Sequence, residues 1–215
     1  EGGIARSPGH CMTMGTASTM TAIAEAMGLT LPGASSIPAM DANHARMAAG
    51  CGRRIVDMVW ENLTPDALVT PASVRNAGVT AMAMGCSTNA VIHLIAMARR
   101  AGVTFGLDDF DALGRDVPVI ANIRPSGDRY LMEDFYLAGG LRALMARLGA
   151  RIDPSPITVT GRPIGETLTD AQVHDDDVIR PLDNPLREDG GMCVLRGNLA
   201  PNGAVLKPSA ATPEL

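Results

Sequence analysis

Apolar side chains recur at helical spacing over most of residues 16–100, and glycine or proline interrupts the pattern at several points. The pattern predicts helices from residue 16 or 18 to about 27, from 41 to about 62, from 70 to a break at 85, and from 88 to 100. A further helix is expected over 132–148, with Gly139-Gly140 as a weak point or a close-packing site. Amphipathic helices bury their apolar stripes against other elements, so this pattern predicts a layer of packed helices.

Residues 117–123 and 157–159 are typical of short buried strands. Because strands alternate with helices, the sequence predicts an α/β fold whose helix-rich N-terminal domain contains parallel strands. Helical periodicity stops after about Gly165, and short β-like runs follow at 192–195 and 204–206. We therefore expect part of an α/β domain at residues 1–165, an interdomain connection at 166–189, and the start of a truncated, β-rich and barrel-like C-terminal domain at 190–215.

The core of this fold has to be built almost without aromatic side chains. Hydrophobic residues make up 46% of the chain and aromatic residues only 3%, and the formal net charge is −5. Nucleic acids bind through stacked aromatics and basic runs, and the sequence has neither, so no nucleic-acid partner is expected. The longest apolar runs are far too short to cross a bilayer, so no membrane partner is expected either.

The cysteine pattern bears on the cellular compartment of the protein, and the two ends of the chain bear on whether the sequence is part of a longer one. No C-x-x-C pair occurs among the four widely spaced cysteines, Cys11, Cys51, Cys86 and Cys193. With no secretory signal, this favours the reducing cytoplasm. The first residues are Glu1-Gly2-Gly3 and the last are Pro213-Glu214-Leu215, which suggests a piece of a longer protein.

Cys11 stands in a loop of small residues directly ahead of the first predicted helix. Glycines there let a ligand approach the backbone, and the N–H groups of a helix start favour a thiolate, an anion or a metal cluster. A single cysteine is also commonly a small buried hydrophobe, and spacing alone does not decide between the two. The break Gly85-Cys86-Ser87-Thr88-Asn89 has the same ambiguity, because it suits either a ligand or an ordinary cap between two packed helices.

The remaining polar clusters do not complete an active site. His10, beside Cys11, points the other way in an extended loop. His93 lies within an apolar helix and reads as a core histidine. The run His174-Asp175-Asp176-Asp177 could bind a hard metal but is more typical of solvated surface, and Glu133-Asp134 suits the first turn of a helix. No nucleophile elbow, P-loop, G-x-G-x-x-G or H-E-x-x-H motif is present.

Read together and in order, several motifs resemble the dihydroxy-acid and sugar-acid dehydratases, the family that includes phosphogluconate dehydratase. The most specific is Gly9-His10-Cys11-Met12-Thr13-Met14-Gly15-Thr16-Ala17-Ser18-Thr19-Met20. The others are Leu31-Pro32-Gly33, Gly85-Cys86-Ser87-Thr88-Asn89-Ala90, Met132-Glu133-Asp134-Phe135-Tyr136 with Ala138-Gly139-Gly140, Val178-Ile179-Arg180-Pro181, Gly190-Gly191 and Gly197-Asn198-Leu199-Ala200-Pro201-Asn202-Gly203-Ala204. The resemblance covers essentially the whole chain but only the middle of a family member.

The resemblance implies an activity, cofactors and one site residue. Family members dehydrate a 2,3-dihydroxy carboxylate to a 2-keto acid with an iron–sulfur cluster, 2Fe-2S or 4Fe-4S, and Mg²⁺. The cluster acts as a Lewis acid on the leaving 3-hydroxyl while a base removes the C2 proton. By this resemblance Cys11 is the third cysteine ligand of the cluster, and family members are generally homo-oligomers in full-length form.

Other parts of the family's machinery have no counterpart in these 215 residues. The other two cluster cysteines, the Mg²⁺-binding aspartate, the carbamylated lysine and the serine base all belong to segments missing here. Cys51, Cys86 and Cys193 do not sit at those motifs, and Cys86 stands where many members have glycine. The chain therefore holds one cluster ligand of three, and we expect it to be inactive alone.

The Cys11 loop favours one branch of the family. Cys-Met-Thr-Met-Gly-Thr-Ala-Ser-Thr-Met resembles the sugar-acid enzymes, so the expected substrate is a small hydroxy acid such as arabinonate or xylonate. The alternative within the family is the dihydroxy-acid dehydratase of branched-chain amino-acid synthesis. An alternative of another class is a non-catalytic helical interaction module in which Cys11 is merely packed. An exposed sulfur beside the 85–89 break would favour an enzyme.

Overall fold

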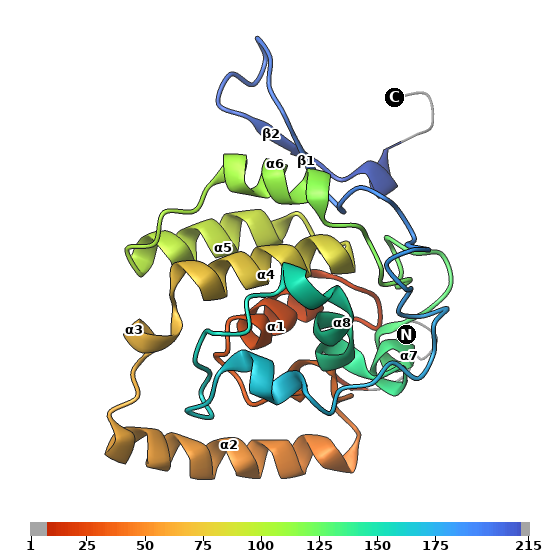
Figure 1. Ribbon diagram of the computed structural model, residues 1–215. Coiled ribbons are helices and arrows are strands. Elements are labelled where there is room, and N and C mark those ends of the chain that lie inside the picture. Colours follow the sequence, from red (N-terminus) through yellow and green to blue (C-terminus); the bar gives the residue numbers. More distant parts are fainter. Residues whose placement is uncertain (1–7, 212–215) are drawn as a thin grey trace.

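The computed structural model describes residues 8–211, and most of its regular structure is helical (Figure 1). The α-helices of this part are α1 (Thr16–Ala26), α2 (Ala42–Glu61), α3 (Pro65–Leu68), α4 (Pro71–Met84), α5 (Asn89–Arg100), α6 (Leu107–Asp116), α7 (Met132–Leu137) and α8 (Gly140–Leu148). One hairpin follows, made of β1 (Cys193–Leu195) and β2 (Ala204–Leu206). No helix in residues 8–211 combines the length and hydropathy needed to cross a membrane.

The predicted helix boundaries are confirmed where the sequence carries capping residues. Asp41 caps α2 by accepting a hydrogen bond from the Asn43 N–H at 2.7 Å, and Asn62 ends that helix with a positive φ of 53°. Thr70 forms a reciprocal capping box with Ser73 at the start of α4. The helices α3 and α6 are additions that the sequence pattern did not reveal.

The core is organised around α4, which runs between α1 and α5 and also contacts α6 (Figure 1). All but three of its 14 residues are buried, including Val79, Met82 and Met84 with no exposed surface. Methionine and alanine fill the space that aromatic rings occupy in other cores. Phe105 and Phe110 form the one ring pair among the described residues, edge to face at 5.1 Å.

The expected strand at residues 117–123 is buried but joins no ladder, so parallel strands are not found among the described residues. Its contacts are single bridges: Val119 with Arg187 and Ala121 with Ile179, both antiparallel, and Ile123 with Tyr130, parallel. The reason lies in its hydrogen bonds. The N–H groups of Ile120 and Ala121 both donate to the Ala83 carbonyl at the end of α4, at 2.9 and 3.2 Å.

The other sheet elements are equally small. Residues 157–159 contribute one bridge, from Ile157 to Pro163. The runs expected near the C-terminus are confirmed as β1 and β2, which pair antiparallel with Val194 opposite Val205. The described chain is therefore mixed α and β, dominated by helices, with one two-stranded antiparallel sheet.

The helix expected over 132–148 is divided into α7 and α8 at the predicted weak point. Gly139 has a φ of +116°, which side-chain-bearing residues rarely adopt. A Cβ at this position would stand 2.3 Å from the Gln172 carbonyl oxygen, so the glycine also admits a neighbouring backbone. The break separates α7 from α8, which lies in the middle of the molecule and packs Leu141, Leu144 and Leu148 into the main core (Figure 1).

The helix α2 lies along one edge of the molecule, apart from the α4–α6 layers (Figure 1). Met58 is its one buried residue, and it packs with Leu68 and Val159 in a small cluster separate from the main core. Most of the apolar residues of α2 are exposed. On α5, Ile92 is likewise 66% exposed, and His93 is exposed, so the prediction of a core histidine is wrong.

Candidate functional site

The loop that carries Cys11 leaves its thiol exposed. The Cys11 Sγ lies 3.2 Å from the Thr13 Oγ1, and hydrogen bonds from the side chain and backbone of Thr13 lower the pKa of the thiol. A lowered pKa raises the fraction of thiolate, which is the form that binds metals. The structure therefore does not show a cysteine packed in the core.

Backbone hydrogen bonds hold this loop against residues 124–132. The Met14 N–H donates to the Arg124 carbonyl at 2.7 Å, and the Met132 N–H donates to the Met12 carbonyl at 2.8 Å. The Met14 side chain is buried in the main core, which anchors the loop from below. Cys11 thus projects from a fixed backbone.

The 85–89 break packs directly against the first turns of α1. The Asn89 Nδ2 donates to the Thr16 Oγ1 at 2.7 Å, and the Ser87 N–H donates to the Thr19 Oγ1 at 3.0 Å. These bonds tie the break to the helix that begins five residues after Cys11. The two motifs that sequence left ambiguous therefore belong to one structural unit, and Thr19 is a member that the sequence pattern did not single out.

Lys207, the only lysine of the sequence, comes from the end of β2 and completes this unit. Its Nζ donates to the carbonyls of Gly85 and Cys86, at 2.9 and 3.0 Å. Ser126 Oγ also donates to the Gly85 carbonyl at 2.6 Å. Burial lowers the pKa of Lys207. A lysine 121 residues away along the chain carries no local pattern that could have revealed this contact.

The other three cysteines occupy different environments. Cys86 is fully buried, and burial raises the pKa of its thiol to about 11, so it stays protonated near neutral pH. Cys193 is half-buried, and burial raises its pKa, with smaller contributions from Asp111 and Asp189. Cys51 is exposed on α2. The structure does not bring any of them into contact with Cys11.

The acidic run at 174–177 is solvated surface, as the sequence favoured. Asp176 pairs with Arg147 at 2.6 Å, and Asp177 accepts a hydrogen bond from the Tyr130 hydroxyl at 2.7 Å. Across residues 8–211 there is no group of three or more histidine, cysteine, aspartate or glutamate side chains that could hold a metal ion. Within this part of the chain no such donor set is assembled for Mg²⁺, and the exposed cysteine thiols are those of Cys11 and Cys51.

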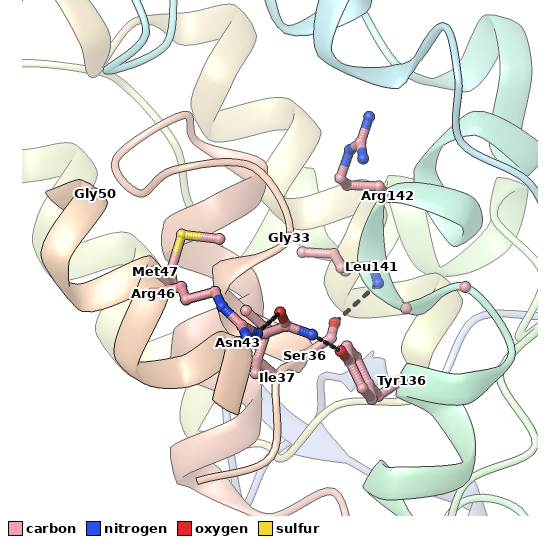
Figure 2. A pocket seen from close by; sticks show the side chains of 12 residues that line it. Gly33, Ser36, Ile37, Asn43, Arg46, Met47, Gly50, Tyr136, Leu141 and Arg142 are labelled. Carbon is pink, nitrogen blue, oxygen red and sulfur yellow. Dashed lines mark hydrogen bonds between the residues drawn. The ribbon is translucent and has the colours of Figure 1, made fainter. Parts of the chain in front are cut away.

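Away from Cys11, a pocket of about 480 Å³ opens between α2, the turn at Ala34–Ser36, and α7–α8 (Figure 2). The Asn43 Nδ2 donates to the Tyr136 hydroxyl at 3.2 Å across it. Arg142 lines the pocket but its guanidinium is turned away, donating to the Thr167 carbonyl and pairing with Asp170. The polar groups are thus occupied by protein partners, and the pocket does not resemble a second catalytic site.

Glu25, on α1, is a buried carboxylate that sequence reasoning missed. Burial raises the pKa of Glu25, while it accepts hydrogen bonds from the N–H groups of Gly33 and Ser35 at 2.6 and 2.8 Å. These bonds hold the Leu31-Pro32-Gly33 turn against α1. Glu25 therefore supports the fold beneath the site.

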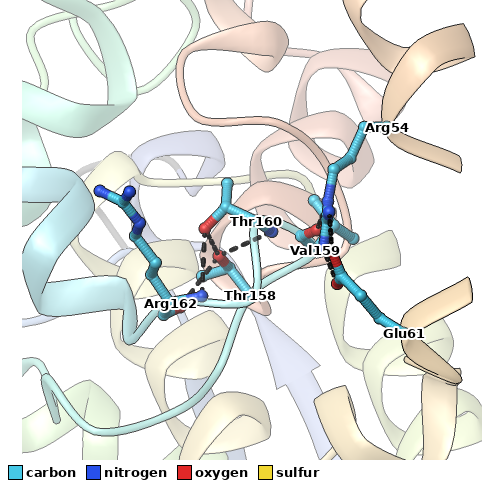
Figure 3. A network of polar contacts seen from close by, with 6 residues as sticks. All are labelled: Arg54, Glu61, Thr158, Val159, Thr160 and Arg162. Carbon is cyan, nitrogen blue, oxygen red and sulfur yellow. Dashed lines mark hydrogen bonds and ion pairs between the residues drawn. The ribbon is translucent and has the colours of Figure 1, made fainter. Parts of the chain in front are cut away.

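A second polar network fastens α2 to the loop at 158–162 (Figure 3). Arg54 donates to the Val159 carbonyl and forms an ion pair with Glu61, two turns further along the same helix. The hydroxyl groups of Thr158 and Thr160 hydrogen-bond to each other at 2.7 Å within the loop. Arg54 and Met58 thus link α2 to the loop at 158–162.

Comparison with known families identifies the chain. Residues 1–167 match the N-terminal model of the dihydroxy-acid/6-phosphogluconate dehydratases, and residues 177–215 match the C-terminal model. The chain therefore belongs to the dihydroxy-acid/6-phosphogluconate dehydratase family, as its motifs suggested.

Its relatives span both branches of that family. The chain is 52% identical over 218 residues to the 6-deoxy-6-sulfo-D-gluconate dehydratase of Pseudomonas putida, covering 100% of the chain and 38% of the relative. It is 49% identical over 217 residues to the L-arabinonate dehydratase of Rhizobium leguminosarum bv. trifolii, with 100% and 37% covered. It is 48% identical over 210 residues to the dihydroxy-acid dehydratase of Ignicoccus hospitalis, with 97% and 38% covered. The chain thus spans little more than a third of the length of these relatives.

Proposed function

We propose that this chain is part of an iron–sulfur, Mg²⁺-dependent hydro-lyase that converts a 2,3-dihydroxy carboxylate to a 2-keto acid with loss of water. The preferred substrate is a sugar acid such as arabinonate or xylonate. The observation that carries the proposal is the exposed Cys11 thiol, with its lowered pKa, on a loop that leads into α1, the helix that is hydrogen-bonded to the 85–89 break.

Each residue of the unit has a role in this proposal. Cys11 supplies one thiolate ligand to the cluster, and the Thr13 hydrogen bonds favour its ionised form. Asn89 and Ser87 are positioning residues, because they fix the first turns of α1 behind the Cys11 loop. When bound, the cluster would supply Lewis-acid assistance to the departing hydroxyl. The remaining ligands, the Mg²⁺ site and the base belong to parts of the family pattern outside this chain.

The sugar-acid branch is favoured over the branched-chain enzyme by the Cys11 loop sequence and by relatives named for arabinonate and sulfogluconate. The branched-chain dihydroxy-acid dehydratase stays the alternative, because a relative of that name is 48% identical. The exposed Cys11 weighs against a purely packed interaction module. Production of 2-keto acid from arabinonate, xylonate and a branched 2,3-dihydroxy acid by the full-length protein would separate the two branches.

The proposal extends to organisation and location. We divide the chain into the cluster-binding domain at 1–165, the connection at 166–189 and the first part of a barrel-like C-terminal domain at 190–215. The ranges of the two family models and the β1–β2 hairpin support this division. Four free cysteines within the described residues are in keeping with a cytoplasmic enzyme.

The test is Cys11→Ser in the full-length protein, with Cys51→Ser as the matched exposed-cysteine control. We expect the first variant to lose iron, acid-labile sulfide and the visible absorption of the cluster, along with turnover, and the second to retain them. A full cluster in the Cys11→Ser variant would refute the ligand assignment. Anaerobic reconstitution of this 215-residue chain alone should give neither a stable cluster nor turnover of an aldonate.

A further inference from the structure

The loop that carries Cys11 rests on two supports from different parts of the chain. The first support is the opening turn of α1, where the Ser18 Oγ donates to the Thr13 carbonyl at 3.2 Å. The second support is the turn that begins at Arg124, whose carbonyl accepts the Met14 N–H at 2.7 Å. Because these bonds fix the backbone that follows the cysteine, the place of its thiol depends on both supports.

Both supports are fastened to the short segment Gly85-Cys86, directly after α4. The first is joined to it through Ser87, whose N–H donates to the Thr19 Oγ1 of α1 at 3.0 Å. The second is joined to it through Ser126, whose Oγ donates to the Gly85 carbonyl at 2.6 Å. A shift of these two peptide groups would therefore move both supports, and with them the loop.

The carbonyls of Gly85 and Cys86 depend on one distant side chain, that of Lys207. Its Nζ donates to both, at 2.9 and 3.0 Å. Within residues 8–211 no backbone N–H donates to either carbonyl, and Ser126 reaches only that of Gly85. Both residues of the segment are buried, and a buried carbonyl without a donor is costly. Loss of the lysine would leave the Cys86 carbonyl unpaired, and the segment would move to relieve it.

The chemistry of lysine suits this position. Its ammonium group directs three N–H donors from a single atom, so it reaches two neighbouring carbonyls at one point, whereas arginine presents its donors in a flat fork. The carbonyls that follow a helix also carry partial negative charge, which favours a cation. Of the 18 lysine and arginine residues in the sequence, this is the one lysine. The contact therefore fits an ammonium group in both geometry and charge.

We propose that Lys207 is a positioning residue of the hydro-lyase, which fixes the Gly85-Cys86 segment and, through both supports, holds Cys11 in place for the cluster. The role rests on the proposed function, because it takes Cys11 as a cluster ligand. Lys207 lies in the part of the chain that matches the C-terminal family model, and Cys11 lies in the part that matches the N-terminal model. Docking of the first family region on the second and retention of the cluster are thereby linked.

The first test is hydrogen exchange of the full-length protein, read by mass spectrometry of its peptides. Lys207→Met should accelerate exchange about tenfold in the peptides that cover residues 12–14 and 85–89, and should leave the middle of α4 unchanged. The matched control is Arg196→Met, which removes another cation of the same hairpin, paired with Asp108 on α6. It should leave all these peptides unchanged. Wild-type exchange in Lys207→Met would overturn the proposal, as would equal acceleration in both variants.

The second test measures the rate at which the full-length protein releases iron to a chelator without oxygen. Lys207→Met should release iron about tenfold faster than the wild type at a temperature well below unfolding. Asn76→Ala also removes a contact of α4, to the Asp153 backbone, but lies away from the Gly85-Cys86 segment and should release iron at the wild-type rate. If Asn76→Ala released iron as fast as Lys207→Met, the effect would reflect stability alone and the proposal would fail.

A milder variant decides the question if Lys207→Met does not fold. Ser126→Ala removes the other donor to the Gly85 carbonyl and should speed iron release about threefold, and an unchanged rate would overturn the proposal. Failure of the proposed function shows itself separately, as a full cluster in Cys11→Ser. When Cys11→Ser has lost the cluster, wild-type iron release in Lys207→Met rejects the positioning role alone.

Discussion

The helices α2 and α4 have equally well-defined ends but opposite surroundings. Both begin with a side-chain cap and both end with a residue of positive φ. Eleven of the 14 residues of α4 are buried, against one of the 20 in α2. The comparison shows that local sequence decides where a helix begins and ends, while the elements around it decide what is buried.

Thiol chemistry should show the largest difference, because Cys86 follows α4 and Cys51 lies on α2. At pH 8, a thiol with a pKa of about 11 is ionised in about one molecule in a thousand, and Cys86 is also buried. We expect alkylation of Cys86 to be at least about a thousandfold slower than that of Cys51, as read by mass spectrometry of peptides over time. Comparable alkylation rates of Cys86 and Cys51 in the folded chain would contradict this prediction. Unfolding in denaturant should bring the two rates close together.

Truncation of a core methionine should be the next largest effect. Met82 in α4 has no exposed surface, so Met82→Ala should lower the free energy of unfolding by about 2–5 kcal/mol. Ile55→Ala on α2, where the side chain is 57% exposed, should change it by less than about 0.5 kcal/mol. Urea unfolding followed by circular dichroism at low protein concentration measures both. Similar losses at the two sites would mean that α2 is covered.

Removal of a polar side chain should also destabilise the protein more in α4 than in α2, although the difference should be smaller than for the core methionine. The Asn76 side chain on α4 donates to the Asp153 carbonyl and accepts from the Asp153 N–H, both at 2.8 Å. Asn76→Ala leaves both backbone groups without these bonds and should cost about 2–4 kcal/mol of stability. Asn43→Ala on α2 removes an exposed contact to Tyr136 and should shift the melting temperature little. Melting curves of the two variants, compared with the wild type, test this.

Acid should loosen α2 before it unfolds the core. The ion pair with Arg54 lowers the pKa of Glu61, so its contribution to stability is present above the unfolded glutamate pKa of about 4.3 and is lost as pH falls through the lower folded value. Hydrogen exchange of the α2 amides should accelerate over that interval while that of α4 does not. Glu61→Gln should remove this pH dependence. An unchanged profile would show that Arg54 acts through Val159 alone.

Sequence patterns predicted the features of this fold that depend on neighbouring residues. The helix start at residue 70 and the glycine break inside 132–148 were predicted because each is set by residues within one or two turns. The exposure of Ile92 and His93 was not, because helical periodicity identifies an apolar face without showing whether anything covers it. The stretch at 117–123 was expected to pair as a strand, but its hydrogen bonds go to the end of α4 and to the loop at 178–187.

In the candidate site, too, some residues could be predicted from the sequence and others could not. Cys11 could be singled out from its loop and from the family resemblance, although neither predicted that Thr13 would lower its pKa. The contacts of Thr19 and Lys207 join segments 68 and more than 120 residues apart, and no local pattern encodes such a distance. Glu25 was missed because a glutamate within a short helix is ordinarily exposed.

The Lys207 contact has a consequence for synthesis of the protein. The carbonyls it binds close the C-terminal end of α4, which is complete in sequence 122 residues earlier. At about 5–20 residues per second, the ribosome needs roughly 6–24 s to reach the lysine. During that interval the end of the central helix lacks its cation, so the nascent chain must hold its core together without the contact that ties the two family regions.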